Sequence, residues 1–293
     1  MTEKGRSAFV TGGSSGIGLA AALRLARTHD RVALFARDMQ RLRGAADLIS
    51  QRFPGCRVTV HCVDVACSAD VKQTMAEAVR EVGAPDRVIL SAGIVELGET
   101  EVLTEAAHRR AMEVNYFGVL WSIRSVLPHL SRGARIGIVG SMAGIAATYG
   151  YAAYAPSKFA LRGLVDILRV ELAGKGIGVT LCLPPDTDTP MLARERAVRH
   201  PVTVRMAAGA PTLSADDVAR ALLAGMDRDS ALVLPCLAAK LTWWLAPVLS
   251  PILRWQQTRL LRQSGPHSAE MFPDHVDEHR DDAPDQEGNR RDQ

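Results

Sequence analysis

The stretch Thr11-Gly12-Gly13-Ser14-Ser15-Gly16-Ile17-Gly18 (TGGSSGIG) directly follows the apolar run Ala8 to Val10. Glycines at this place allow a tight turn and let the backbone approach a ligand closely. The first turn of the helix that follows offers free N–H groups and its positive dipole end to an anionic group such as a pyrophosphate. An ordinary turn between a strand and a helix is the alternative for this stretch taken alone. We predict a dinucleotide-binding turn, with contacts from Gly12, Ser14, Ser15, Gly16 and Ile17.

Apolar, β-branched runs alternate along the chain with segments of helical periodicity, such as Leu19 to Ala26 and Met75 to Val82. Strands that are apolar throughout and separated by helices are typical of a parallel sheet covered on both faces. We therefore predict an α/β fold, a doubly wound (Rossmann) parallel sheet whose ligands bind beyond the carboxyl ends of the strands. The expected strands are Ala8 to Val10, Val32 to Phe35, Val58 to Val63, Val88 to Leu90, Ile136 to Val139 and Val179 to Leu183.

The chain has 293 residues, 47% of them hydrophobic, and is long enough for one large core. We predict a main domain at 1–234, an apolar C-terminal segment at 235–264 and an acidic tail at 265–293. The tail holds nine acids and three arginines, a net charge of −6, which leaves +9 on residues 1 to 264. Because the tail has little apolar surface to bury, we expect it to be disordered.

The cysteines, the N-terminus and the basic charge of residues 1 to 264 indicate the cellular compartment and the kinds of partner to expect. The five cysteines form no Cys-X-X-Cys pair, so we expect neither a disulfide framework nor a metal site, and a reducing compartment fits best. No apolar stretch of signal-peptide length precedes the first motif, which indicates a cytoplasmic protein. The excess of base has no aromatic interleaving or recognition motif, so no nucleic-acid partner is expected.

The second expected strand ends in Ala36-Arg37-Asp38, and Arg41 follows one helical turn on. An acid at the end of this strand would bind the 2′-hydroxyl of NAD, whereas a guanidinium accommodates the 2′-phosphate of NADP. Arg37 and Arg41 therefore predict NADP, although a solvated helix start is an alternative for both. We expect Asp38 to be the N-cap of the next helix rather than a ribose ligand.

Two further strand ends complete the predicted cofactor site. Asp64 and Val65 follow the third expected strand, where they are placed to meet the adenine ring. Ser91-Ala92-Gly93 follows the fourth, and the small residues Ala92 and Gly93 let the backbone pass close to the nicotinamide ribose.

Three tyrosines cluster before Lys158, and only Tyr154 lies four residues before it. This spacing places the phenol and the ammonium on one face of a helix, and Pro156 is acceptable in the first turn of that helix. A nearby cation stabilises the phenolate and lowers the pKa of Tyr154 from its ordinary value of about 10. We predict that Tyr154 is the general acid and that Tyr149 and Tyr151 are packing or substrate-loop residues.

Ser141 and Asn115 are two further polar candidates. Ser141 follows the fifth expected strand, where its hydroxyl can hold a carbonyl oxygen that gains negative charge as hydride arrives. An ordinary turn serine is the alternative. Asn115 lies in a helical stretch, although asparagine is a poor helix former, and structural capping is an equal interpretation of it.

Together these residues resemble the short-chain dehydrogenase/reductase family over roughly residues 5 to 234. The family's glycine motif matches Gly12, Gly16 and Gly18, and its catalytic tetrad matches, in order, Asn115, Ser141, Tyr154 and Lys158. The resemblance implies that Lys158 also binds the nicotinamide ribose, that Asn115 holds a water in the proton relay to Tyr154, and that the protein is a homo-oligomer. One departure is Ser91, where the family usually has asparagine.

The segment Pro184 to Met191 (PPDTDTPM) follows the sixth expected strand. Because proline lacks the donor N–H and disfavours helical geometry in the residue before it, we predict a rigid loop. In the family this loop clamps the nicotinamide carboxamide, which implies that Thr187 and Thr189 are cofactor contacts, with Pro185 in place of the usual glycine. The run is similar to that of the 3-ketodihydrosphingosine reductases, as is Tyr154 to Gly163 apart from Ala155 and Pro156.

This resemblance implies NADPH-dependent reduction of 3-ketosphinganine, a long-chain lipid ketone, to sphinganine in sphingolipid biosynthesis. Another lipophilic carbonyl compound, such as a steroid ketone, retinal or a 3-oxoacyl compound, is the alternative substrate. A module that senses dinucleotides without catalysis is the alternative outside the enzyme class, since a fold does not determine function.

Leu232 to Leu253 is almost wholly apolar, with Lys240 its single charge and Trp243 and Trp244 close by. We expect Pro247 and Pro251 to break up any straight membrane span. Arg254, Arg259 and Arg262 follow, which suits attachment to an anionic membrane surface. Packing of this segment on the protein or in a dimer interface is the alternative.

Overall fold

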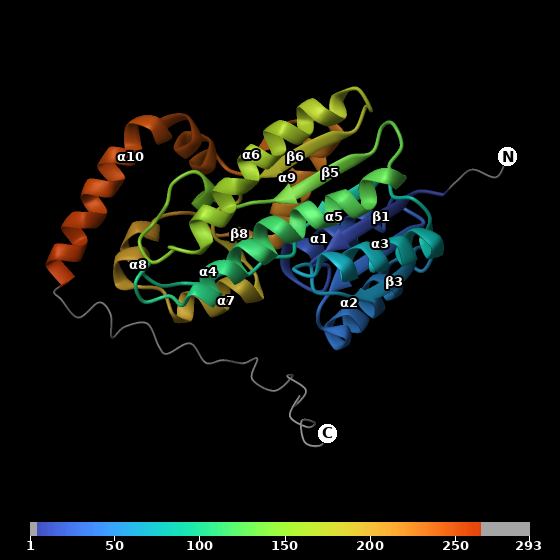
Figure 1. The fold of residues 1–293 in the computed structure, drawn as a ribbon, viewed down its shortest axis with the longest axis horizontal. Coiled ribbons are helices and arrows are strands. Elements are labelled where there is room, and N and C mark those ends of the chain that lie inside the picture. Colours follow the sequence, from blue (N-terminus) through green and yellow to red (C-terminus); the bar gives the residue numbers. More distant parts are fainter. Residues whose placement is uncertain (1–4, 265–293) are drawn as a thin grey trace, which may run out of the picture.

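The computed structural model describes residues 5–264, in which a seven-stranded parallel sheet has the order β3-β2-β1-β4-β5-β6-β9 (Figure 1). The predicted doubly wound sheet is thereby confirmed, and each of the six expected runs forms a strand with ends shifted by at most a residue. The acidic tail predicted at 265–293 lies outside the described residues. The strands are β1 (Ser7–Thr11), β2 (Arg31–Ala36), β3 (Arg57–Cys62), β4 (Arg87–Leu90), β5 (Arg135–Val139), β6 (Gly178–Cys182) and β9 (Leu232–Val233).

The edge strand β9 was not among the strands expected from the sequence. It is the start of the apolar run Leu232 to Leu253, and it pairs with β6 through Leu232 opposite Leu181 and Val233 opposite Cys182. The first residues of that run therefore complete the sheet instead of belonging to a membrane segment.

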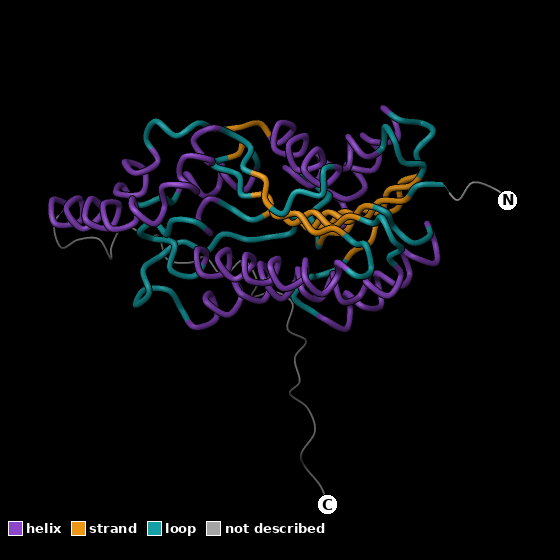
Figure 2. The backbone as a smooth tube through the Cα atoms, turned by 90° about the horizontal axis from the view of Figure 1, so that it is seen from above, coloured by secondary structure: helices purple, strands orange, loops and turns teal. Residues whose placement is uncertain are grey.

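Helices cover both faces of the sheet, which Figure 2 shows edge-on between two helical layers. One layer packs on the apolar cluster that includes Val10, Leu34 and Ile89. The other packs on the cluster that includes Phe9, Phe35 and Ile136. The first layer holds α1 (Gly16–Leu25), α2 (Met39–Arg52) and α9 (Ala215–Asp227); the second holds α3 (Ser68–Val82), α5 (Gly118–Val126) and α6 (Tyr154–Ala173).

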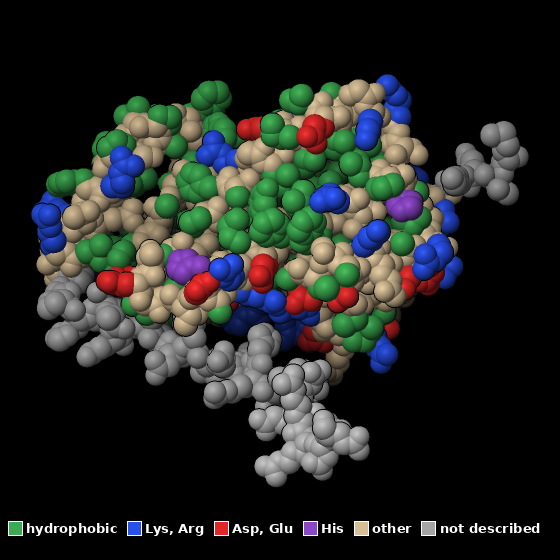
Figure 3. Space-filling view, in the orientation of Figure 1, with side chains coloured by type: hydrophobic (Ala, Val, Ile, Leu, Met, Phe, Trp, Pro, Cys, Tyr) green, Lys and Arg blue, Asp and Glu red, His purple; other side chains and the backbone are tan. Residues whose placement is uncertain are grey.

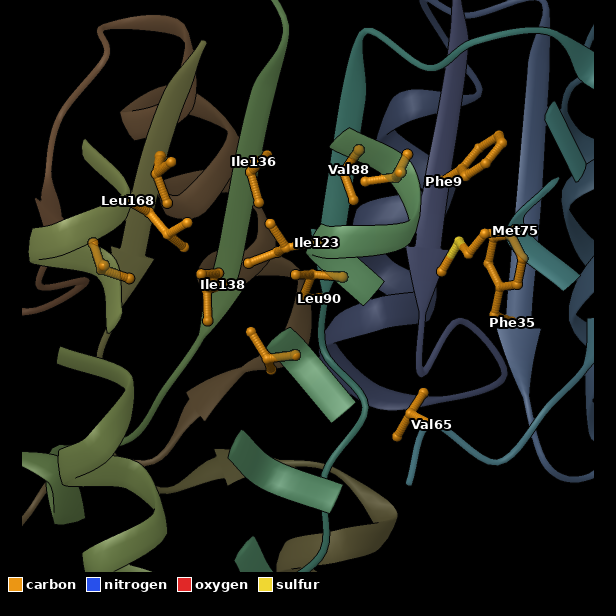
Figure 4. Close-up of a cluster of buried hydrophobic side chains, with 14 of the residues drawn as sticks. Phe9, Phe35, Val65, Met75, Val88, Leu90, Ile123, Ile136, Ile138 and Leu168 are labelled. Carbon is orange, nitrogen blue, oxygen red and sulfur yellow. The ribbon is translucent and has the colours of Figure 1, made fainter. Parts of the chain in front are cut away.

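The larger cluster lies between the sheet and this second layer (Figure 4). Phe9 and Phe35 are fully buried, with ring centroids 5.3 Å apart, and Met75 of α3 and Ile123 of α5 pack against the same cluster. Each such side chain contributes about 1.5–3 kcal/mol when it is fully buried. The resulting rigid sheet determines where the carboxyl ends of its strands, and the residues that follow them, lie.

Short elements gather beyond these carboxyl ends. The segment after β6 was predicted to be a loop throughout, but Thr187 and Asp188 form a two-residue strand, since both are free of the proline constraint and can pair in a ladder. α7 then begins at Pro190, with Thr189 as its N-cap. The elements are α4 (Glu105–Met112), η1 (Glu113–Phe117), η3 (Met142–Gly144), β7 (Thr187–Asp188), α7 (Pro190–Ala197), α8 (Pro201–Ala207) and β8 (Leu213–Ser214). The short helix η2 (Leu127–His129) lies instead between α5 and the amino end of β5.

The described chain ends in the long helix α10 (Leu237–Ser264). The helix runs through Pro247 and Pro251, and Figure 1 shows it as a bent orange-red helix at the edge of the molecule. Each proline lacks one helical donor and bends the helix without ending it. None of the helices within residues 5–264 combines the length and apolarity that crossing a bilayer requires.

Candidate functional site

A cavity of about 530 Å³ lies beyond the carboxyl ends of the strands. The structure brings all the predicted site residues except Asn115 into its wall. The lining residues among them are Gly12, Ser14, Ser15, Gly16, Ile17, Arg37, Arg41, Asp64, Val65, Ala92, Gly93, Ser141, Tyr154, Lys158, Thr187 and Thr189.

The glycine-rich turn forms one end of this cavity. Gly12 and Gly16 have φ of +66° and +55°, a region that other residues rarely adopt. A Cβ on Gly12 would lie 2.7 Å from the Ala92 nitrogen, and one on Gly18 would lie 2.2 Å from the Gly12 oxygen. The Ser15 side chain makes no capping hydrogen bond to α1, which leaves backbone donors of its first turn open to a ligand. The turn therefore fits a pyrophosphate.

Arg37, Asp38 and Arg41 line the cavity where β2 ends. Asp38 caps α2 as predicted, and its carboxylate accepts a hydrogen bond from the Arg41 N–H at 2.9 Å. The same carboxylate lies 3.1 Å from Nε of Arg41. The Arg37 guanidinium, by contrast, makes no hydrogen bond or ion pair within residues 5–264. Arg37 is thus the freer cation for a phosphate.

Asp64 and Gly93 follow β3 and β4. Burial raises the pKa of Asp64, but hydrogen bonds from the Ala66 N–H at 3.0 Å and from Arg110 at 2.9 Å outweigh it and hold this pKa below its ordinary value. Asp64 is therefore ionised and oriented. A Cβ on Gly93 would lie 3.1 Å from Oδ1 of Asn115 and 3.5 Å from Nζ of Lys158. The backbone here passes directly beside two of the predicted catalytic residues.

Tyr154 is the first residue of α6, and Lys158 lies one turn later on the same face. Both are buried; Nζ of Lys158 lies 5.5 Å from the centroid of the Tyr154 ring and donates to the Val139 carbonyl at 3.4 Å. Ser141 lies close enough to the Tyr154 phenol to act on its pKa, which it lowers. Burial lowers the pKa of Lys158 to about 8, because the cavity wall offers its ammonium little compensating charge.

The prediction that Lys158 lowers the pKa of Tyr154 is wrong for this structure. Burial raises the pKa of the phenol above its ordinary value, and the charges of Glu195 and Asp186 add to the increase. The interaction with Ser141 lowers this pKa but does not outweigh them. The physical reason is desolvation, which disfavours a phenolate more than an ammonium 5.5 Å from the ring favours it.

Asn115 lies outside the cavity wall, in the π-helical turn η1. Its side chain is fully buried and accepts a hydrogen bond from the Ile94 N–H at 2.9 Å. Its amide donates to the Ile94 carbonyl at 3.0 Å and to Oγ of Ser157 at 2.9 Å. Asn115 thereby joins the chain after β4 to the residue that precedes Lys158.

The profile of the short chain dehydrogenase family matches residues 6–200. The chain belongs to this family. It is 36% identical over 200 residues to a 3-dehydrosphinganine reductase of Danio rerio, which covers 67% of this chain and 60% of that protein. It is 30% identical over 266 residues to a 3-ketodihydrosphingosine reductase of Dictyostelium discoideum, and the match covers 85% of this chain and 80% of that protein. The chain thus spans less than two thirds of the length of the first relative.

Solved structures of short-chain dehydrogenases and related reductases share the fold. A dehydrogenase/reductase from Sinorhizobium meliloti 1021 has a TM-score of 0.68 at 32% identity, over 79% of this chain and 94% of its own. A short-chain dehydrogenase from Sphingobium yanoikuyae in complex with NADPH has a TM-score of 0.69 at 27% identity, over 88% of this chain and 94% of its own.

In this short-chain dehydrogenase, the PPDTDTPM segment is held by its own threonines. Oγ1 of Thr187 donates to the Pro185 carbonyl at 2.9 Å, and Oγ1 of Thr189 donates to the Thr187 carbonyl at 3.1 Å. Thr189 also accepts a hydrogen bond from the Leu192 N–H at 3.2 Å, which starts α7. These contacts are consistent with the rigidity predicted for the segment.

A charged group that sequence reasoning missed lies in the same wall. Arg199 forms ion pairs with Asp186 of the PPDTDTPM segment and with Glu195 of α7. Tyr151 donates to Glu195, and its ring centroid lies 5.8 Å from that of Tyr154. The i, i+4 spacing of Glu195 and Arg199 is the one signal in the sequence that points to this group.

Proposed function

We propose that this short-chain dehydrogenase reduces 3-ketosphinganine to sphinganine with NADPH in sphingolipid biosynthesis. The observation that carries the proposal is the meeting of Ser141, Tyr154 and Lys158 in the wall of one cavity that a dinucleotide turn also lines. This arrangement supports reduction of a carbonyl group. The substrate follows from the relatives, which bear the names 3-dehydrosphinganine reductase and 3-ketodihydrosphingosine reductase.

The cavity fits NADPH by its chemistry. Gly12 lets the turn lie directly against the backbone of Ser91 and Ala92, where any side chain would clash. Arg37 presents at the cavity wall a guanidinium that makes no ion pair within residues 5–264, and a guanidinium at this place accommodates a 2′-phosphate. Lys158 is a buried ammonium whose hydrogen bond to the Val139 carbonyl is long, at 3.4 Å, so it can also bind the ribose hydroxyls. Thr187 and Thr189 would adjoin the carboxamide. When bound, NADPH supplies the hydride that adds to the carbonyl carbon.

The residues of the chain provide the rest of the reaction. Ser141 holds the ketone oxygen by a hydrogen bond, and the Tyr154 phenol donates the proton that this oxygen takes up. The Lys158 ammonium offsets the negative charge that Tyr154 then carries, which is needed because burial raises the pKa of the phenol. Asn115 positions Ile94 and Ser157 beside them, and the water relay through Asn115 stays a prediction.

Helix α10 supports a lipid substrate and peripheral attachment to the cytoplasmic side of a membrane. Its inner face packs on the body: Ala239 is buried, and the Arg162 guanidinium lies 4.5 Å from the centroid of the Trp243 ring. Its outer face carries a row of exposed apolar side chains. Figure 3 shows apolar and basic side chains next to each other over the region of α10. The apolar row consists of Leu237, Leu241, Trp244, Leu245, Val248, Ile252 and Trp255.

This row has helical spacing, so it forms one continuous face beside Lys240, Arg254 and Arg259. An apolar face with adjacent cations suits an anionic bilayer surface. Thr242 and Leu253 of the same helix line the cavity, so the membrane-facing helix also borders the site. A long-chain ketone would thus pass from the bilayer to Tyr154 along α10. We further propose, from the family, that the protein is a homo-oligomer.

A panel of carbonyl compounds tests the proposed function. Purified protein in detergent micelles would be given NADPH with 3-ketosphinganine, a steroid ketone, retinal or a 3-oxoacyl thioester, and products identified by mass spectrometry. We expect the highest kcat/KM with 3-ketosphinganine. Faster turnover of another carbonyl compound overturns the proposed substrate, and NADPH binding without turnover of any of the four compounds overturns the enzymatic function.

A further inference from the structure

Three charged side chains, Asp186, Glu195 and Arg199, form a compact group in the wall of the cavity. The Arg199 guanidinium donates two hydrogen bonds of 2.7 Å to the Asp186 carboxylate, one to each oxygen. It also donates to Glu195 from Nε at 2.8 Å and from Nη2 at 2.5 Å. The three side chains are 22%, 11% and 6% exposed for Asp186, Glu195 and Arg199, respectively. They are therefore held in one arrangement in the cavity wall.

The two carboxylate oxygens of Glu195 differ in their contacts. Oε1 accepts all three hydrogen bonds, two from Arg199 and one from the Tyr151 hydroxyl. Oε2 accepts none from any residue between 5 and 264. Because Glu195 lines the cavity, this second oxygen is the acceptor that it can offer to a ligand.

The group also carries an unbalanced charge. Two carboxylates face a single buried guanidinium, which leaves one excess negative charge. Arg196 reaches Asp186 at 3.4 Å but is 51% exposed, and Arg194 lines the cavity from the exposed side of α7, so water screens both cations. A cation on the ligand would balance the charge of the buried group.

This charge lies close to the reacting centre. Tyr151, which donates to Glu195, has its ring centroid 5.8 Å from that of Tyr154. The charges of Glu195 and Asp186 also act on the Tyr154 phenol, whose pKa they raise. A cation bound at Glu195 would therefore lie on the part of the substrate that adjoins the reacting carbonyl.

We propose that Oε2 of Glu195 binds the ammonium group that neighbours the ketone of the substrate. The proposal rests on the proposed function, since 3-ketosphinganine carries an amine on the carbon next to its ketone. Asp186 and Arg199 are positioning residues that orient Glu195 through the contacts on Oε1. Steroid ketones, retinal and 3-oxoacyl thioesters carry no cation at this place, so the charge selects against them.

The test compares two substrates in the wild type and in Glu195→Gln. The substrates are 3-ketosphinganine and the matched ketone in which hydrogen replaces the amine, both in micelles with NADPH. The assay runs at about pH 6.5, below the pKa of about 7.7–8.0 of an ordinary α-amino group. We expect Glu195→Gln to lower kcat/KM for the aminoketone about 10- to 100-fold, mainly through KM, as loss of one charge-assisted contact does. The matched ketone should change by less than about threefold.

Glu171→Gln is the control, because Glu171 is exposed near the end of α6 and lies outside the cavity wall. It should leave both substrates unchanged. A parallel loss on both substrates in Glu195→Gln shows a merely structural role and overturns the proposal.

The wild type alone provides a second measurement if Glu195→Gln does not fold. It should prefer the aminoketone over the matched ketone by about tenfold or more. Equal efficiency on the two ketones overturns the role of Glu195 while the proposed function stands. Turnover of neither ketone, with activity on another class, overturns the proposed function itself.

Discussion

Replacing Arg37 by alanine should shift the cofactor preference from NADPH towards NADH, and more strongly than replacing Arg41. The Arg37 guanidinium has no ion pair within the described chain, so all of its hydrogen-bonding capacity is available to a 2′-phosphate. Nε of Arg41 already lies 3.1 Å from Oδ2 of Asp38, which is itself held as the cap of α2. Binding of a phosphate by Arg41 therefore competes with an existing contact.

The size of the effect follows from these contacts. One hydrogen bond between charged groups contributes about 1.5–3 kcal/mol, and about 1.4 kcal/mol corresponds to a factor of ten. Arg37→Ala should thus lower kcat/KM with NADPH about 10- to 100-fold, nearer the lower figure because the site is exposed. Arg41→Ala should lower kcat/KM with NADPH about threefold to tenfold. NADH has no 2′-phosphate, so its kcat/KM should change by less than about twofold in either variant.

The assay is steady-state oxidation of NADPH and of NADH with a saturating ketone. Arg43→Ala is the matched control, because Arg43 lies in α2, as Arg41 does, and is exposed but does not line the cavity. An unchanged ratio of NADPH to NADH efficiency in Arg37→Ala would refute the assignment. A larger effect for Arg41 than for Arg37 would refute the reasoning from the Asp38 contact.

Because burial lowers the pKa of Lys158 to about 8, its ammonium is present below this pH and lost above it. The value of kcat/KM should therefore fall on the alkaline side with a midpoint near pH 8. A kcat/KM that stays constant up to about pH 9.5 contradicts this role of Lys158. Gly18→Ala places a Cβ 2.2 Å from a backbone oxygen and should lower the free energy of unfolding by about 1–3 kcal/mol or more. Gly44→Ala, on the open surface of α2, should raise it by about 0.5–1 kcal/mol. Denaturant unfolding measures both, and equal midpoints for the two variants contradict this prediction. Trp244→Glu with Val248→Glu should abolish sedimentation with anionic vesicles without changing the melting temperature; retained binding excludes this face as the attachment surface.

The fold and most of the cavity wall were predictable because both depend on local patterns. An apolar run such as Val32 to Phe35 forms a strand wherever helices cover it, and parallel strands place their carboxyl ends together. The residues after those ends, such as Asp64 and Ser141, must then meet at one edge. Asp38 was predictable as a cap because capping depends on the next three residues alone.

The rest depends on contacts that no local pattern encodes. The pKa of Tyr154 rises instead of falling because burial is a property of the whole fold. Asp186 meets Arg199 only because β7 and α7 fold back over the cavity, so their pairing could not be deduced from either motif. In α10, the prolines predict an interruption, yet packing of one face on the body keeps the helix continuous through Pro247.

Transfer of deuterium from labelled NADPH tests the central proposal most directly. Protein in micelles would be given 3-ketosphinganine and NADPH that carries deuterium at the transferable position, and the product analysed by mass spectrometry. We expect sphinganine with one deuterium on the former ketone carbon. In Tyr154→Phe, which keeps the ring but lacks the proton donor, labelled product should form about 10²- to 10⁴-fold more slowly while NADPH still binds. Unlabelled sphinganine, no sphinganine, or an undiminished rate in Tyr154→Phe would contradict the proposed reaction.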